Sequence, residues 1–359
     1  MSSDVVTPPR STGEVFPDAA NGDGNQPLWR AFARWEAGLV VVFVGVLIFG
    51  SVKSPTFTDP STIFYLGINT GAVAIMALPM TFVVMTGEID LSVASMLGLS
   101  AATVGYLWHH GWGIWPAFLV ALAVGIVGGA LNGLLVARFG LPSIAVTIGT
   151  LTLFRGLAEV LLGSLTIPTI GDRQFPSWTT NLGSNSIPGT QLSWSMLFFL
   201  ILAILFAVVL HYSPLGRSMV AIGLQPEAAQ FAGVRVNRIK FWLFVLSGLL
   251  SAFAGILVML QNQSVSYDVG TGLELNVVAI VLFGGVSIFG GRGTIVGVVL
   301  SVAIVGSLQM ALTQINVSAD KQNIVTGVLL LISVIVPNGG EALRRVRDRL
   351  RRRPLPRAG

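Results

Sequence analysis

Residues 62–86 read TIFYLGINTGAVAIMALPMTFVVMT and contain no Asp, Glu, Lys or Arg. At about 1.5 Å of rise per residue, a helix of this length crosses the roughly 30 Å hydrocarbon core of a bilayer. A helix also pairs its backbone N–H and C=O groups within itself, as a solvent without water requires. The run therefore predicts a transmembrane helix, and it sets the pattern for the rest of the chain.

The composition of the 359-residue chain agrees with this prediction. Hydrophobic residues make up 53% and charged residues only 10%, whereas soluble domains carry about 25% charged residues. The 42 glycines suit helices that pack closely in a membrane. Cysteine is absent, which excludes disulfides, thiolate metal sites and cysteine nucleophiles. We therefore expect an all-α, polytopic membrane protein.

Ten apolar stretches follow one another between short polar breaks, each a candidate membrane span. They are 37–52, 62–86, 91–107, 114–136, 141–163, 194–211, 239–260, 273–289, 293–312 and 320–336. The stretches 91–107 and 273–289 are short and bounded by polar or glycine-rich residues, so one of them is expected to be re-entrant or broken. Spans 2 to 5 and 7 to 10 have opposite orientations in this scheme, which predicts an inverted repeat.

The basic residues orient the predicted spans, because Lys and Arg gather in cytoplasmic loops. With ten spans and an inner N-terminus, 17 of the 21 basic residues fall inside. Only Lys53, Arg173 and Lys321 fall outside, and Arg155 lies within a span. Eight arginines beyond residue 343 form a tail that suits anionic lipid headgroups better than nucleic acid. Both termini are therefore expected in the cytoplasm.

The chain divides into three predicted regions. Residues 1–34 are rich in Ser, Pro, Gly and Asp without apolar periodicity, so we expect a disordered cytoplasmic tail. Residues 35–338 form the transmembrane domain, and 339–359 form the basic cytoplasmic tail. Within the transmembrane domain, the long loop 164–193 is expected to cap the outer face. The other long loop, 212–238, is predicted to lie inside.

A short helix is predicted within the inner loop. Pro226 suits the first turn of a helix, Glu227 suits its positive N-terminal end, and Gly233 suits its C-terminal stop. The expected helix has about two turns and lies outside the membrane. On this pattern alone, an ordinary connector is an equally good interpretation.

Three motifs resemble one known family. Residues 216–248, GRSMVAIGLQPEAAQFAGVRVNRIKFWLFVLSG, resemble the cytoplasmic loop of the ribose-type permeases of ATP-binding-cassette importers. Residues 85–93, MTGEIDLSV, are similar to the family's Gly-Gly-Ile-Asp-Leu-Ser-Val signature, with Glu88 where a second Gly is common. Residues 283–297, FGGVSIFGGRGTIVG, resemble the family's glycine-rich turn between late spans. The motifs follow in the family's order, and the resemblance covers nearly the whole chain after about residue 35.

The resemblance implies a permease subunit in a bacterial inner membrane that imports monosaccharides or related small polyols. It implies three partners, which are a cytoplasmic ATPase, an extracytoplasmic sugar-binding protein and a second permease subunit. In this family a short helix of the inner loop docks on the ATPase and transmits its closure. The matching positions here are Gly216, Arg217, Pro226, Glu227, Ala228, Ala229 and Gly233.

Motifs for catalysis or cofactor binding are missing from the sequence. The Walker A pattern G-x-x-x-x-G-K-[ST] does not occur, so ATP would be used by the partner and not by this chain. The three histidines lack the spacing of a metal site. The cluster of Gly290, Gly291 and Gly293 follows no predicted strand, which favours a tight turn over a phosphate site. We therefore expect no catalytic residue, metal or cofactor in this chain.

Charged residues at membrane depth are costly, and they often mark a pathway or gate. Glu88 and Asp90 are candidates for that role, although Asp90 could instead cap a helix that begins at Leu91. Arg155 and Glu159 lie four residues apart on one helix face, which predicts a structural ion pair. A role of that pair in the pathway is the alternative.

Amide side chains within the predicted spans are further candidates. They could meet sugar hydroxyls along a pathway, or they could hold helices together by hydrogen bonds. The candidates are Asn69, Asn132 and Asn276.

Two other functions are compatible with a polytopic chain. An ion-coupled secondary transporter would need no ATPase, but no chain of acidic residues crosses the spans. A membrane-embedded sugar transferase would need clustered acids or a metal motif, and only Glu88 and Asp90 qualify. Transport that survives without any ATPase would favour the first of these alternatives.

Overall fold

The computed structural model describes residues 28–163, 165–167, 173–329, 331–332 and 335. This part of the chain folds into helices and contains no strand longer than an isolated bridge. The helices are α1 Leu28–Lys53, α2 Pro60–Met85, α3 Val93–His109, α4 Ile114–Gly133, α5 Ser143–Leu162, α6 Ser177–Ser184, α7 Trp194–Tyr212, α8 Pro214–Leu224, α9 Pro226–Phe231, α10 Val236–Asn262, α11 Leu273–Phe283 and α12 Ile295–Gln314. A 3-10 turn at Pro55–Thr58 precedes α2, and a π-helical turn at Leu134–Arg138 extends α4.

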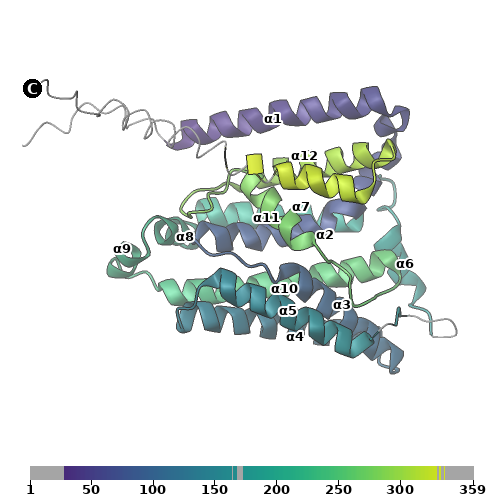
Figure 1. Ribbon diagram of the computed structural model, residues 1–359, viewed down its shortest axis with the longest axis horizontal. Helices are drawn as coiled ribbons and strands as arrows, with labels where there is room; N and C mark the ends of the chain where they lie inside the picture. The colour runs from purple at the N-terminus through teal and green to yellow at the C-terminus, as the bar shows by residue number, and fades with distance from the viewer. Residues whose placement is uncertain (1–27, 164, 168–172, 330, 333–334, 336–359) are drawn as a thin grey trace, which may run out of the picture.

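The long helices lie side by side in a bundle (Figure 1). The short helices α8 and α9 lie at one end of the bundle, and α6 lies at the opposite end. We call these the α9 end and the α6 end. Helix α1 lies along one edge of the bundle and packs on α12, whereas α10 runs through the middle against α2, α3 and α4.

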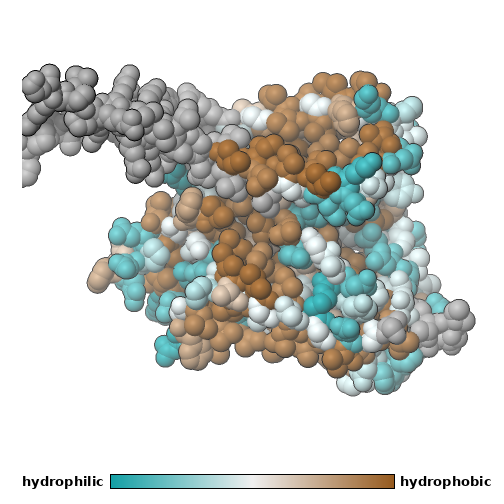
Figure 2. Space-filling model, viewed as in Figure 1, coloured by the Kyte–Doolittle hydropathy of each residue, from teal (hydrophilic) through white to brown (hydrophobic). Residues whose placement is uncertain are grey.

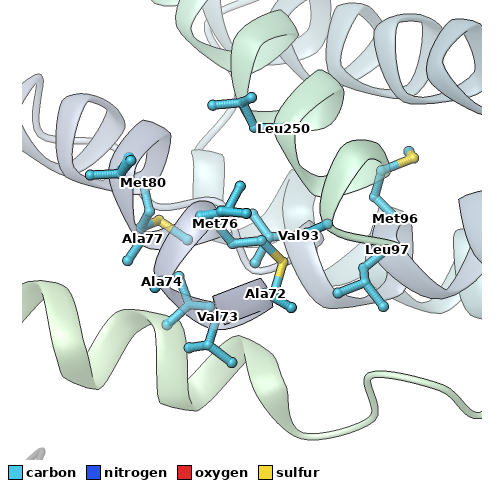
Figure 3. Close-up of a cluster of buried hydrophobic side chains, with 14 of the residues drawn as sticks. Ala72, Val73, Ala74, Met76, Ala77, Met80, Val93, Met96, Leu97 and Leu250 are labelled. Carbon is cyan, nitrogen blue, oxygen red and sulfur yellow. The ribbon is translucent and has the colours of Figure 1, made fainter. Parts of the chain in front are cut away.

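The centre of the bundle is built from α2 and α10. From Thr70 to Met85 every side chain of α2 is buried, which explains why its sequence is apolar on all sides. Figure 3 shows Met76 of α2, Val93 of α3 and Leu250 of α10 within the same apolar cluster. The remaining helices surround this centre.

The outer helices expose apolar side chains. Large apolar residues of α1, α4, α5 and α7 are open to the surroundings, including Val41, Val127 and Val160. Figure 2 shows brown, apolar surface over much of the bundle, with hydrophilic residues gathered toward its ends. A surface of this kind is suited to lipid and not to water.

The predicted all-α, polytopic membrane fold is confirmed. Seven helices are long and apolar enough to cross a membrane, and each coincides with one of the ten predicted spans. Helix α11 has 11 residues, about 16 Å of length, which is too short to cross about 30 Å of hydrocarbon. Helix α3 has 17 residues and is also short. Each follows a non-helical segment, 86–92 before α3 and 263–272 before α11.

Two predicted boundaries differ from the structure or extend beyond the residues it describes. Helix α1 begins at Leu28, so the tail predicted for 1–34 extends too far. Residues 28–34, LWRAFAR, are mostly good helix formers that continue the apolar span behind them. The tenth predicted span is helical at 319–329, and its remainder lies partly outside the described residues. Residues 1–27 of the predicted N-terminal tail and the whole predicted tail 339–359 also lie outside them.

The described residues of the long loop 164–193 pack on the α6 end of the bundle. Ile167 pairs with Val265 through two backbone hydrogen bonds of 2.9 and 2.8 Å. Helix α6 lies so close to α10 that a Cβ at Gly183 would lie 1.9 Å from the Leu260 carbonyl oxygen. The described residues of the loop therefore pack on this end of the bundle, whereas the cap over the outer face of the membrane stays a prediction.

Candidate functional site

The three sequence motifs meet at the α9 end, although they are far apart in the chain. The Gly291 backbone N–H donates to the Met85 carbonyl oxygen at 2.8 Å. A Cβ on Gly223 of α8 would lie 2.0 Å from that oxygen and 2.1 Å from the Gly291 nitrogen. A Cβ on Gly290 would lie 2.8 Å from the Gly223 Cα. We call Met85, Gly223, Gly290 and Gly291 the glycine junction.

The glycine-rich motif forms a tight turn between α11 and α12. Gly290 and Gly291 have φ values of 82° and 73°, in the left-handed region that residues with a Cβ rarely adopt. The turn lies against α8 and the end of α2. The interpretation of this motif as a turn is therefore confirmed.

The predicted helix of the inner loop is present as α9. Glu227 lies in its first turn, and Gly233, with φ of 86°, follows its end. Ala229 is buried against Ile222 of α8 and Val236 of α10 in a small apolar cluster. This cluster holds α9 at a defined position although the helix is only six residues long.

The opposite side of α9 is open. Glu227 and Ala228 are exposed, and Phe231 is 93% exposed. A large aromatic side chain in this position is typical of a surface that binds a partner. Pro226 occupies the first turn of α9, as predicted.

The start of the loop bends sharply from α7 into α8. Ser213 caps α8, since its Oγ accepts from the Gly216 N–H at 3.3 Å. A Cβ at Gly216 would lie 1.9 Å from the Leu210 carbonyl oxygen, so only glycine fits this close approach. Arg217 is exposed beside it.

Glu88 forms an ion pair with a residue that sequence reasoning missed. The Lys240 Nζ of α10 lies 2.5 Å from the Glu88 Oε1, with both side chains largely buried. The pair lines a pocket of about 430 Å³ together with Arg138 and Asn237. Glu88 stands where the resembling family commonly has Gly, so this link between 86–92 and α10 depends on that departure.

Asp90 is enclosed and fully engaged. Its Oδ1 accepts from the Ser92 N–H at 3.0 Å and the Ser92 Oγ at 2.6 Å, and its Oδ2 accepts from the Ser247 Oγ at 2.7 Å. The carboxylate is 1% exposed. Helix α3 begins at Val93 and not at Leu91. Asp90 accepts from the amide of Ser92, the residue that precedes the helix. This geometry favours the packing alternative over the pathway alternative.

Asn132 joins the same buried cluster from α4. Its Nδ2 donates to the Ser92 Oγ at 2.8 Å. Its Oδ1 has no hydrogen-bond partner in the described part of the chain. From α5, Ser143 accepts from the Ile89 N–H at 3.2 Å. The segment 86–92 is thus tied to α4, α5 and α10.

The predicted ion pair of Arg155 with Glu159 is wrong. Among the described residues, the Arg155 guanidinium instead donates from Nη1 to the carbonyl oxygens of Tyr267 at 3.0 Å and Val269 at 2.7 Å. Glu159 is exposed on the outside of α5. The i,i+4 spacing allows a pair, but Arg155 faces the 263–272 segment, where it satisfies backbone carbonyls and its charge interacts with Glu274 and Asp268.

The other two candidate asparagines, Asn69 and Asn276, lie apart from the Asp90 cluster. Asn69 is exposed on α2, and Asn276 is half-buried on α11. Neither side chain makes a hydrogen bond within the described residues. They therefore do not act as links between helices in this structure.

Comparison with known proteins defines the class of this chain. Residues 62–334 match the family described as branched-chain amino acid transport system / permease component. The ribose import permease protein RbsC of Bacillus subtilis is 34% identical over 82% of this chain and 90% of its own. The L-arabinose ABC transporter permease protein AraH of Azospirillum brasilense is 33% identical over 92% and 93%.

One further relative and one solved structure also show similarity to this chain. The autoinducer 2 import system permease protein LsrD of Salmonella paratyphi A is 29% identical over 86% of this chain and 92% of its own. A solved structure titled "An inward-facing conformation of a putative metal-chelate type ABC transporter" is a distant likeness, with a TM-score of 0.44 and 17% identity over 87% of this chain and 99% of that one. The chain belongs to the family of ribose-type importer permeases, which confirms the resemblance seen in its motifs.

Proposed function

We propose that this chain is the permease subunit of an ATP-driven importer for a neutral monosaccharide or a related small polyol. The observation that carries the proposal is the family match over 62–334, shared with permeases named for ribose and L-arabinose import. The family's own description names branched-chain amino acids, which are the second candidate substrate.

The α9 end supplies the means of coupling to an ATPase. Helix α9 presents Glu227, Ala228 and Phe231 outward, while its buried side rests on α8 and α10. Helix α8 in turn contacts the end of α2 and the turn between α11 and α12 through the glycine junction. A displacement of α9 by a closing ATPase would therefore reach α8 through the apolar cluster around Ala229, and α2 through the backbone contacts of the glycine junction.

The transport cycle follows from such a displacement. We propose that the α9 end is cytoplasmic, that a binding protein delivers substrate at the α6 end, and that a second permease subunit completes the pathway. ATP is used by the partner. Closing of the ATPases would shift the bundle between outward-open and inward-open states, which is a population shift of a two-state element.

Uptake by vesicles that contain this chain with its co-purifying ATPase and binding protein tests the proposal. The labelled substrates are ribose, L-arabinose and leucine, with and without ATP. Wild type should import a sugar only with ATP, and Glu227→Arg should lower that uptake at least about tenfold by opposing the ATPase surface. Asp320→Arg, a charge reversal at an exposed residue of 319–329, is the matched control.

The outcomes separate the candidates. ATP-dependent uptake of leucine but not of either sugar would establish the amino-acid alternative. Uptake that needs no ATPase and ignores Glu227→Arg would identify a secondary carrier and contradict the proposal. Co-purification of the ATPase with each variant shows whether the complex still assembles.

A further inference from the structure

The 263–272 segment lies deep in the bundle without forming a helix. Its Val269 carbonyl oxygen would lie 2.7 Å from a Cβ at Gly98 of α3, and Val265 contacts α3 at Gly105. Trp108 lies near the end of α3 that faces the α6 end of the bundle. Gly98 lies about 15 Å along the helix from Trp108. Val269 is therefore about half the thickness of a hydrocarbon core below the α6 end.

Non-helical backbone at this depth must contact protein or water, because lipid cannot satisfy its polar groups. Arg155 satisfies one side by donating to the Tyr267 and Val269 carbonyl oxygens. Asp268, Thr271 and Gly272 of the segment are exposed. The Arg155 charge also interacts with the nearby carboxylates of Glu274 and Asp268. The segment is thus fixed to the bundle through its carbonyl groups, and it keeps exposed polar residues.

The exposed polar residues carry a preformed set of oxygen atoms. The Ser266 Oγ donates to the Asp268 Oδ1 at 2.6 Å, and the Thr271 Oγ1 donates to the Asp268 carbonyl oxygen at 2.6 Å. The Asp268 Oδ2 makes no hydrogen bond within the described residues. A free carboxylate oxygen is a strong acceptor for a hydroxyl group.

Asp268 and Asp90 lie in similar backbone segments but have different surroundings. Both carboxylates follow the start of a break in the helical backbone, at 86–92 and at 263–272. Asp90 is enclosed with both oxygens bonded, whereas Asp268 is exposed with one oxygen free. In Figure 2, hydrophilic residues also reach from the α6 end toward the middle of the visible face. A charged, exposed group at membrane depth marks a pathway more often than a structural contact.

We propose that Asp268, with Ser266 and Thr271, lines the translocation pathway and accepts hydrogen bonds from sugar hydroxyls as the substrate passes. The inference deepens the proposed function and rests on it. Arg155 acts as a positioning residue that holds the backbone of the segment. The weak contact that one carboxylate and two hydroxyls provide suits a site that must release its substrate.

The absence of cysteine from the natural chain makes a direct test possible, because each single-cysteine variant reports on one position. The assembled complex in vesicles is treated with a small, charged methanethiosulfonate reagent. Thr271→Cys should react at least about tenfold faster than the control Val160→Cys, which is 81% exposed on the apolar side of α5. Saturating ribose or L-arabinose, whichever is imported, should slow the reaction of Thr271→Cys.

Equal reaction rates for Thr271→Cys and Val160→Cys would overturn the proposal, since the segment would then face lipid or a tight protein contact. A reaction that no imported sugar slows would also count against it. Wild-type uptake is measured separately. If wild type imports no sugar although Thr271→Cys reacts quickly, the proposed function is contradicted, but exposure of the segment to water is still supported.

Substitution of the carboxylate provides the second arm of the test. Asp268→Asn should lower the rate of sugar uptake at least about tenfold while the affinity of the complex for its binding protein is unchanged, because a hydrogen bond to a charged group is lost only during passage. Asp268→Glu should recover part of the rate. Asp320→Asn is the matched control. Full uptake by Asp268→Asn would contradict the role of the carboxylate.

Discussion

Single residues decide how the α9 end is joined to the central helices. Two kinds of contact meet there, which are the backbone contacts of the glycine junction and the ion pair of Glu88 with Lys240. The glycine junction requires residues without a side chain. The ion pair requires two specific side chains that are far apart in the sequence. Each can be changed without touching α9 itself.

Gly223→Ala tests the glycine junction. The new Cβ would lie about 2 Å from two backbone atoms, the Met85 carbonyl oxygen and the Gly291 nitrogen, so α8 must move. We expect a lower melting temperature of the purified protein and at least about tenfold slower uptake, because overpacking of this kind costs about 1–3 kcal/mol. Gly45→Ala on α1, where a Cβ meets nothing within 4 Å, is the matched control. Unchanged melting of Gly223→Ala would show that the junction is looser than the structure indicates.

Exchange of the ion-pair residues tests the link from 86–92 to α10. Glu88→Ala or Lys240→Ala should each destabilise the protein by about 1–2 kcal/mol, because the remaining charge is largely buried and unpaired. The double variant Glu88→Lys with Lys240→Glu should recover most of this loss. Denaturation of the single and double variants in detergent measures the coupling, and additive effects would show that the pair contributes nothing.

At the scale of the element, α3 and α11 are shorter than the seven long spans, and each begins after a non-helical segment. They occupy the third and eighth predicted spans. An inverted repeat of spans 2 to 5 and 7 to 10 would relate these two positions, so the repeat stays a prediction that the paired breaks support. The start of α3 is held by Asp90 and its partners.

Two serines of α10 provide a matched test of that arrangement. Both Ser247 and Ser251 are fully buried, but the Ser247 Oγ donates to Asp90 whereas the Ser251 Oγ has no partner in the described residues. Ser247→Ala should destabilise the protein by about 1–3 kcal/mol, because a buried carboxylate loses a donor. Ser251→Ala should be neutral or slightly stabilising. Equal melting temperatures of the two variants would contradict a structural role for Asp90.

At the scale of the whole molecule, α6 and α9 lie at opposite ends of the bundle, so they should lie on opposite sides of the membrane (Figure 1). The distribution of basic residues predicts which side is which. Because α6 belongs to the loop predicted outside and α9 to the loop predicted inside, the two helices report the orientation independently.

Single cysteines at these two ends measure the orientation directly. Thr180→Cys on α6 and Phe231→Cys on α9 are both exposed positions. A membrane-impermeant thiol reagent should label Thr180→Cys from outside intact cells and Phe231→Cys only in inside-out vesicles. The reverse pattern would invert the proposed topology and, with it, the assignment of α9 to the ATPase.

The local sequence was sufficient to predict the long helices of this protein. Uninterrupted apolar runs must become helices in lipid, so the fold class and the seven long spans could be predicted from hydropathy alone. The position of α9 could be predicted from the turn chemistry of Pro226 and Gly233. Both features depend on neighbouring residues in the chain, which the sequence records directly.

Only the tertiary structure decided which polar groups meet. Glu88 and Lys240 are 152 positions apart, and Arg155 bonds carbonyls more than 100 positions away instead of the acid one turn along its helix. Helix packing also encloses Asp90 and leaves Asp268 exposed, although both acids lie in a non-helical segment that precedes a short helix. Hydropathy determines whether a segment enters the membrane, but the partner of a charge is set by the three-dimensional packing of helices that are distant in sequence.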